Sequence, residues 1–227
     1  NDTINGGAGN DTIDGNDGVD SIHGDDGDDG ITGGTGNDSI TGGAGNDTIN
    51  AENGANDNVD GGAGNDTVTI SATANLVVGD VYVGGEGTDT VSFTAQIADS
   101  AATFSKFSGF EVFNAAPAAT DTFTMSNFTN NNFTTVTLGD VGNAALVIDN
   151  APDTLTDLTI VAGSAGDTYT VNRLVDGTAN TVNITHSATG TISITDLNIA
   201  NEEIVTVNAG ALATDDVTYT NMDLSDA

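Results

Sequence analysis

A nine-residue repeat fills the first 69 residues of this chain and leaves it few folds to choose from. Four copies match the repeat at every fixed position, and they begin at Gly6, Gly33, Gly42 and Gly61. Looser or displaced copies begin at Gly15, Gly24, Ala51 and Gly84. A fixed period this short predicts a solenoid, in which each repeat supplies one turn and one very short strand.

One aspartate recurs in every copy, and a β-branched apolar residue follows it two positions later. The aspartates are Asp2, Asp11, Asp20, Asp29, Asp38, Asp47, Asp57, Asp66 and then Asp89. The apolar residues are Ile4, Ile13, Ile22, Ile31, Ile40, Ile49, Val59, Val68 and Val91. Side chains alternate along a strand, so we expect the apolar residue to point inward and its two neighbours outward.

The turns between these strands need backbone conformations that most residues avoid. Glycine reaches positive φ without strain and leaves room for carbonyl groups to approach an ion. Asn16 and Asp25 stand where fuller copies have glycine, and these residue types best tolerate a left-handed backbone. We expect surface charge from the acidic residues outside the recurring position, which are Asp14, Asp17, Asp25, Asp26, Asp28 and Asp60.

The chain is strongly acidic, with 34 Asp and Glu against 2 Lys and Arg and a net charge of −32. Nucleic acid and anionic membranes are poor partners for such a surface, because both attract basic patches. Disorder is the alternative that this charge suggests, but 37% apolar residues and a strict period argue against it. One buried apolar side chain per repeat offsets only part of the conformational entropy lost on folding. Carboxylate and carbonyl oxygens at the turns, with neither His nor Cys among them, favour calcium as the missing stabiliser.

The copies resemble the RTX (hemolysin-type calcium-binding) nonapeptide, G-G-x-G-x-D-x-U-x. The resemblance implies a right-handed parallel β-roll, in which two copies form one coil and calcium lies between turns on the same side. One edge would then carry Asp2, Asp20, Asp38 and Asp57, and the other edge Asp11, Asp29, Asp47 and Asp66. Three gaps between turns on each edge imply roughly six ions.

The resemblance also implies that turn carbonyl groups contribute to the metal sites. Those carbonyls lie near Gly6, Gly7, Gly9, Gly15, Gly18, Gly24, Gly27, Gly33, Gly34, Gly36, Gly42, Gly43, Gly45, Gly61, Gly62 and Gly64. The turn at 51–56 lacks the paired glycines, which leaves the site at Asp57 open. Asp89 would be a detached ninth ligand in a capping turn.

Beyond residue 92 glycine becomes rare, and short Thr-, Val-, Ile- and Asn-rich segments follow at intervals of about a dozen residues. They centre on Val112, Val136, Ile148, Ile160, Val171, Ile184, Ile194, Val205 and Val217. Such spacing is typical of a sandwich, barrel or solenoid. We therefore predict an all-β chain, with an RTX roll and its capping repeat at 1–92 and a β-rich structural or assembly domain at 93–227.

The order of RTX copies, spacer, further copy and a strand at 110–113 resembles the C-terminal portions of RTX-containing bacterial S-layer proteins. That resemblance implies type I secretion from a Gram-negative cell, folding at the extracellular cell surface, and self-assembly into a lattice or filament. The absence of cysteine fits an extracellular protein that metal rather than disulfides holds together. The chain begins without Met and part-way through a repeat, so we expect it to be a fragment of a longer polypeptide.

No enzyme motif is recognisable in the sequence. It contains neither H-E-x-x-H nor G-x-S-x-G, and the nearest stretch, 163–166, has the wrong spacing for a nucleophile elbow. His23 and His186 are the two histidines, and nothing marks either as a base. We expect no catalysis, no membrane insertion and a calcium-dependent surface protein. The alternatives are an adhesin that binds cell-surface glycans and the calcium-binding tail of a larger secreted enzyme.

Overall fold

A computed structural model of the chain describes residues 1–51, 56–71, 79–94, 106–116, 121–128, 130–139, 145–151, 154–160, 168–173, 181–186, 192–198, 204–209 and 217–220. The chain forms two compact units. Unit 1 comprises Asn1–Phe113 and Phe128–Asn131, and unit 2 comprises Asn114–Asn127 and Asn132–Ala227.

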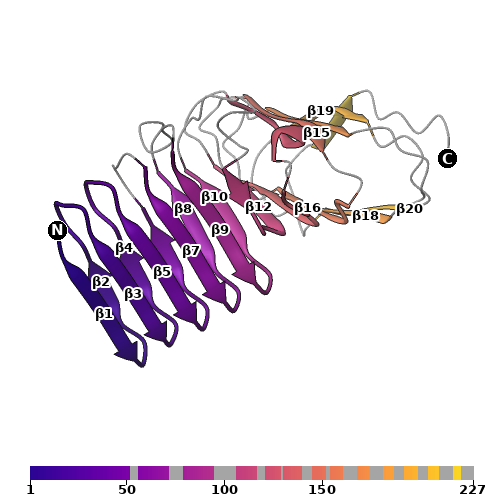
Figure 1. Cartoon of the computed structure of the whole chain (residues 1–227). Helices are drawn as coiled ribbons and strands as arrows, with labels where there is room; N and C mark the ends of the chain where they lie inside the picture. The colour runs from indigo at the N-terminus through magenta and orange to yellow at the C-terminus, as the bar shows by residue number, and fades with distance from the viewer. Residues whose placement is uncertain are drawn as a thin grey trace. The chain divides into compact units, whose positions relative to one another are not determined.

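Unit 1 is a stack of flat coils, which Figure 1 shows in indigo to magenta from the N terminus onward. Its strands are β1 (Thr3–Ala8), β2 (Thr12–Asp14), β3 (Ser21–Asp26), β4 (Gly30–Thr32), β5 (Ser39–Ala44), β6 (Thr48–Asn50), β7 (Asn58–Ala63), β8 (Thr67–Ile70), β9 (Val81–Glu86), β10 (Thr90–Phe93), β11 (Phe107–Ser108) and the first half of β12 (Val112–Ala115). Odd-numbered strands form one sheet in the order β1-β3-β5-β7-β9-β11, and even-numbered strands from β2 to β12 follow one another in a second sheet. The pairings between neighbouring coils from β1 to β11 are parallel. The predicted parallel β-roll of two repeats per coil is confirmed.

The register follows the nonapeptide. Thr3 pairs with Ser21 and Ile4 with Ile22, so each apolar residue lies beside the equivalent residue of the next coil. The copy at 51–60 has ten residues, and its extra residue does not break this register, because Val59 still pairs with Ile40. The turn of that copy, 52–55, lies outside the described residues.

Strand geometry agrees with the expected alternation. In β2 the central Ile13 is buried while Thr12 and Asp14 are exposed. The odd-numbered strands from β1 to β9 run six residues and include the first glycines of the following repeat, which the sequence had suggested would lie in turns. Asn16 and Asp25 adopt φ of 63° and 73°, as their positions predict.

The core of unit 1 changes character along the stack. The early coils bury one Ile or Val per strand, such as Ile22, Ile31 and Ile40. The last coils instead bury a cluster of aromatic rings made of Tyr82, Phe93, Phe107, Phe110, Phe113 and Phe128. Tyr82 and Phe107 stack with centroids 4.8 Å apart. Because aromatic side chains bury far more apolar area than Ile or Val, we expect this end of unit 1 to depend less on bound metal.

Unit 2 contains the strands predicted beyond residue 113, together with one at Asp121–Thr124 that the sequence analysis did not predict. They are β13 (Asp121–Thr124), β14 (Thr135–Leu138), β15 (Ala145–Ala151), β16 (Asp157–Ile160), β17 (Thr168–Arg173), β18 (Thr181–His186), β19 (Ile192–Asn198), β20 (Ile204–Ala209) and β21 (Val217–Thr220), with one 3-10 turn, η2 (Met125–Asn127). Each paired strand lies parallel to the next strand but one, as in a solenoid. The described strands therefore resolve the choice between solenoid and sandwich in favour of the solenoid.

Helix is almost absent from the described residues. Among them, no helix has the length and hydropathy needed to cross a membrane. The stretch 163–166, the nearest in sequence to a nucleophile elbow, lies outside the described residues.

Candidate metal centre

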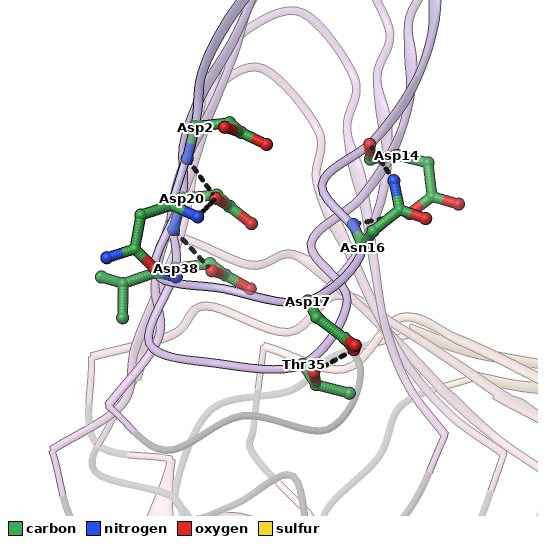
Figure 2. A network of polar contacts seen from close by, with 9 residues as sticks. Asp2, Asp14, Asn16, Asp17, Asp20, Thr35 and Asp38 are labelled. Atoms are coloured by element: carbon green, nitrogen blue, oxygen red, sulfur yellow. Dashed lines mark hydrogen bonds and ion pairs between the residues drawn. The ribbon is translucent and has the colours of Figure 1, made fainter.

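The recurring aspartates of unit 1 form two continuous rows. In each row the aspartates immediately precede the strands of one sheet. In both rows the backbone N–H of one aspartate donates to Oδ1 of the aspartate one coil further on. Figure 2 shows Asp2, Asp20 and Asp38 stacked in this way, with their carboxylates pointing in the same direction. The strand that follows each aspartate fixes its position, because strand pairing already aligns the coils.

The first row comprises Asp2, Asp20, Asp38, Asp57 and Asp80. Its steps span 18, 18, 19 and 23 residues, and the hydrogen bonds measure 2.5 to 3.1 Å. The lengthening of the steps follows the irregular copies of the repeat. The carboxylates nonetheless stay in register, so the row continues past the end of the uninterrupted nonapeptides.

The second row comprises Asp11, Asp29, Asp47, Asp66 and Asp89. Its hydrogen bonds measure 2.7 or 2.8 Å. At its end the backbone N–H of Asp89 donates to Oε2 of Glu111 at 2.9 Å, so a glutamate replaces the next aspartate. The structure thus groups the predicted aspartates into the same two edges that the resemblance implied.

The second carboxylate oxygen of the row aspartates, Oδ2, indicates a ligand site. Within the described part of the chain, a buried Oδ2 without a hydrogen-bond partner occurs in Asp11, Asp20, Asp29, Asp38, Asp47, Asp57, Asp66 and Asp89. Asp57 and Asp66 are each 0% exposed. A buried carboxylate oxygen without a partner is costly, and here the cost recurs once per turn. A cation at each turn would remove it.

The unpartnered carboxylate oxygens and glycine carbonyls both border the position that a Cβ would occupy on the first glycine of each pair. A Cβ built on Gly6 would lie 2.7 Å from Asp11 Oδ2 and 2.7 Å from the carbonyl oxygen of Gly24, one coil further on. The same pair of obstacles, a row carboxylate and the next coil's carbonyl, meets a Cβ on Gly24, Gly42, Gly61 and Gly84. The first glycine of each pair is therefore needed for space. Its partner is needed for conformation, as at Gly43 with φ of 123°.

The donor set fits calcium and little else. Among the described residues no three His, Cys, Asp or Glu side chains gather around one point. An ion at a turn would therefore combine one or two row carboxylates with backbone carbonyl oxygens. Calcium accepts such all-oxygen sets of mixed carboxylates and carbonyls in flexible geometry, whereas zinc and copper favour nitrogen and sulfur ligands.

Burial and mutual repulsion perturb the carboxylates. Burial is the main cause that raises the pKa of Asp57 and Asp66 from 3.8 to about 6. The hydrogen bond from the preceding aspartate's N–H lowers the pKa by less, and neighbouring carboxylates raise it further. The pKa values of Asp38, Asp47 and Asp89 are raised for the same first reason. In the absence of a cation, these side chains are poised to bind protons.

Calcium-free and calcium-loaded protein should therefore respond to acid in opposite directions. Without calcium, protonation of Asp57 and Asp66 favours the folded roll, so this contribution to stability is full below pH 3.8 and is lost as the pH rises through about 6. With saturating calcium the carboxylates of the folded roll stay ionised, so stability falls as the pH drops through 3.8, where the unfolded chain takes up protons. Thermal unfolding followed by circular dichroism at constant ionic strength measures both slopes. A metal-free protein whose stability rises with pH across this window contradicts the assignment.

The structure places the predicted aspartates in the two rows that the repeat implies, and Asp2, Asp57 and Asp89 need separate comment. Asp2 lies in its row but is exposed, at the outer end of the stack. Asp57 is fully buried in the first row despite its glycine-poor turn. The expectation that Asp89 is detached is wrong, because its Oδ1 accepts from the Asp66 N–H at 2.8 Å. The aspartates predicted as surface charge, Asp14, Asp17, Asp25, Asp26, Asp28 and Asp60, are all exposed. Whether the row members bind calcium remains a prediction.

Sequence reasoning missed Asp80 and Glu111. Asp80 precedes Tyr82 by two residues, and Gly84 and Gly85 follow, which reproduces the repeat with an aromatic residue in the apolar position. Glu111 likewise precedes Phe113 by two residues. A search that allowed aromatic residues at the apolar position and glutamate at the acidic one would have found both.

Comparison with known proteins bears on the N-terminal region. A family model, the RTX calcium-binding nonapeptide repeat (four copies), matches residues 1–31 and 26–56. No curated protein and no solved structure shows significant similarity to the chain. The S-layer resemblance is not confirmed by these comparisons. The paired rows of buried carboxylates, the parallel roll and the family match agree, and the N-terminal region of this chain is built of RTX calcium-binding nonapeptide repeats.

Proposed function

We propose that this chain is a calcium-dependent structural segment of a bacterial cell surface, belonging to an S-layer or surface filament. The observation that supports it best is the repetition of a buried carboxylate with an unpartnered oxygen at successive turns of both rows. A single metal site could serve signalling or catalysis. Metal sites repeated at successive turns instead connect each coil to the next and so stabilise the roll.

The chain's own residues determine what calcium would do here. Row aspartates such as Asp29 and Asp47, with the carbonyls of the repeat's first glycines, such as Gly42 in β5, would hold the ions. Bound calcium would supply positive charge and a cross-link between neighbouring coils. The Oδ1 hydrogen bonds already align the carboxylates, so an ion finds its ligands in register. Because calcium binds only the folded roll, its concentration controls folding.

This linkage suits export. RTX repeat proteins bind calcium and are generally secreted. We propose that this chain leaves the cell unfolded through a type I system, where intracellular calcium is too low to fold it, and folds in the calcium of the medium. The proposal assigns no catalytic role to the segment.

Self-assembly is the finer part of the proposal. Copies that each carry a charge of −32 repel one another, so association should require the charge neutralisation that calcium provides. Negative-stain electron microscopy of the purified chain, with calcium and with chelator, tests this. Ordered sheets or fibres in calcium alone are expected.

Other outcomes identify the alternatives. Folded but dispersed monomers in calcium contradict self-assembly and favour an adhesin module, which a glycan array would then examine. A catalytic domain encoded upstream of Asn1 would instead identify the segment as the tail of a secreted enzyme.

A further inference from the structure

One of the two basic residues of the chain lies at the end of the first aspartate row. Lys106 Nζ is 3.8 Å from Asp80 Oδ2. The Lys106 side chain is 13% exposed and that of Asp80 is 0% exposed. In a chain with 34 acidic side chains and 2 basic ones, the pairing of this particular carboxylate with a lysine stands out from its surroundings.

Asp80 otherwise resembles the rest of its row. Its Oδ1 accepts from the Asp57 N–H at 3.1 Å, just as Asp57 Oδ1 accepts from Asp38. The difference lies at Oδ2. In Asp20, Asp38 and Asp57 this oxygen is buried without a hydrogen-bond partner, whereas in Asp80 it faces an ammonium group.

Strand pairing holds the lysine in this place. Lys106 immediately precedes β11, whose Phe107 pairs with Tyr82 of β9. The Lys106 carbonyl accepts from the Tyr82 N–H at 3.0 Å, and the Phe107 ring stacks on Tyr82. The backbone from which the ammonium group extends is therefore anchored to the coil that contains Asp80.

We propose that the Lys106 ammonium is a built-in cation that takes the place of calcium at Asp80 and ends the first row of metal sites. The inference rests on the proposed binding of calcium to the rows. A buried carboxylate requires a compensating cation, and a lysine supplies one that neither dissociates nor depends on calcium concentration. The second row ends differently, because Glu111 accepts the hydrogen bond from Asp89 and adds negative charge rather than positive. The two edges of the roll therefore differ in how many calcium ions they take.

The experiment compares the calcium content and calcium-dependent stability of the full chain with those of K106M and K106Q. Either substitution removes the cation and leaves the Asp80 carboxylate in place, so the variants are expected to bind about one more calcium ion per chain than the wild type. They should also require more calcium to fold. The double variant D80N/K106M, which removes both charges, should return to the wild-type calcium content. R173M is the matched control, because it removes the chain's other positive charge from unit 2.

Equilibrium dialysis with metal analysis counts the ions, and circular dichroism follows folding across a calcium titration. A K106M chain with the wild-type calcium content overturns the inference, whether or not its stability falls. So does failure of both K106M and K106Q to fold at saturating calcium, because the ion would then be unable to replace the ammonium group. A wild-type chain that binds no calcium contradicts the proposed function itself, which separates the two failures.

Discussion

In excess chelator at neutral pH, the roll of unit 1 is expected to lose its β-sheet circular dichroism and to regain it when calcium is added. The rows stack carboxylates one coil apart, and most of these side chains are buried. Without a cation, burial and like-charge repulsion both oppose folding. The early coils bury only one Ile or Val per strand, and this small apolar core offsets little of the free energy that opposes folding.

The size of the effect follows from linkage. An ion that binds only the folded state stabilises it by about 2.7 kcal/mol when its free concentration is 100-fold above Kd. Two rows contribute several such sites, and their contributions add because all of them require the same coils to be stacked. The sum is comparable with the whole stability of an ordinary domain, about 5–15 kcal/mol. We therefore expect a steep folding transition on calcium titration.

Hydrogen exchange locates the loss within the chain. Chelation should remove amide protection from residues 1–51 and 56–71 first, and protection should persist longest around Tyr82 and Phe107, where the aromatic cluster supplies its own core. Magnesium at the same concentration is the control, because it demands a stricter geometry and dehydrates reluctantly. A β-rich spectrum with full protection of residues 1–51 in chelator would refute the dependence on metal.

The periodic part of the fold was predictable from sequence because each nonapeptide encodes its own turn, strand and acidic ligand. Register between coils followed from the same period, and even the left-handed conformations of Asn16 and Asp25 could be assigned from residue type. Local chemistry decides each of these features, so no knowledge of distant residues was needed.

The irregular part was predictable only in outline. Asp80 and Asp89 lie 23 residues after their predecessors, so a fixed-period search misses Asp80 and finds Asp89 only through its own copy of the repeat, without its place in the row. Phe128 lies outside the repeats but packs against Phe107 and Phe113 in the aromatic cluster of unit 1. Its local sequence does not predict these contacts. In unit 2, strand positions were predicted, but pairing of each strand with the next but one is a property of topology that spacing alone does not distinguish from a sandwich.

Substitution D66N should move the stability of the roll in opposite directions with and without calcium. The asparagine Oδ1 can still accept from the Asp47 N–H, a hydrogen bond of 2.8 Å in the wild type. Its Nδ2 takes the position of an oxygen that is buried and unpartnered. In chelator, where the wild-type roll is expected to be largely unfolded, the variant should have the larger folded fraction, because it removes a buried charge next to Asp47 and Asp89.

With calcium the order reverses, since an amide is a weaker calcium ligand than a carboxylate. We expect the calcium midpoint of folding to rise by about tenfold or more, which corresponds to about 1.4 kcal/mol. D17N is the matched control, because Asp17 is exposed and its Oδ1 accepts only from Thr35 Oγ1 at the surface, so it should leave both measurements unchanged. D66A removes the hydrogen bond as well, and it should weaken the calcium response without the gain that D66N shows in chelator. If D66N instead lowered stability in chelator and left the calcium midpoint unchanged, Oδ2 of Asp66 would be a structural acceptor and no metal ligand.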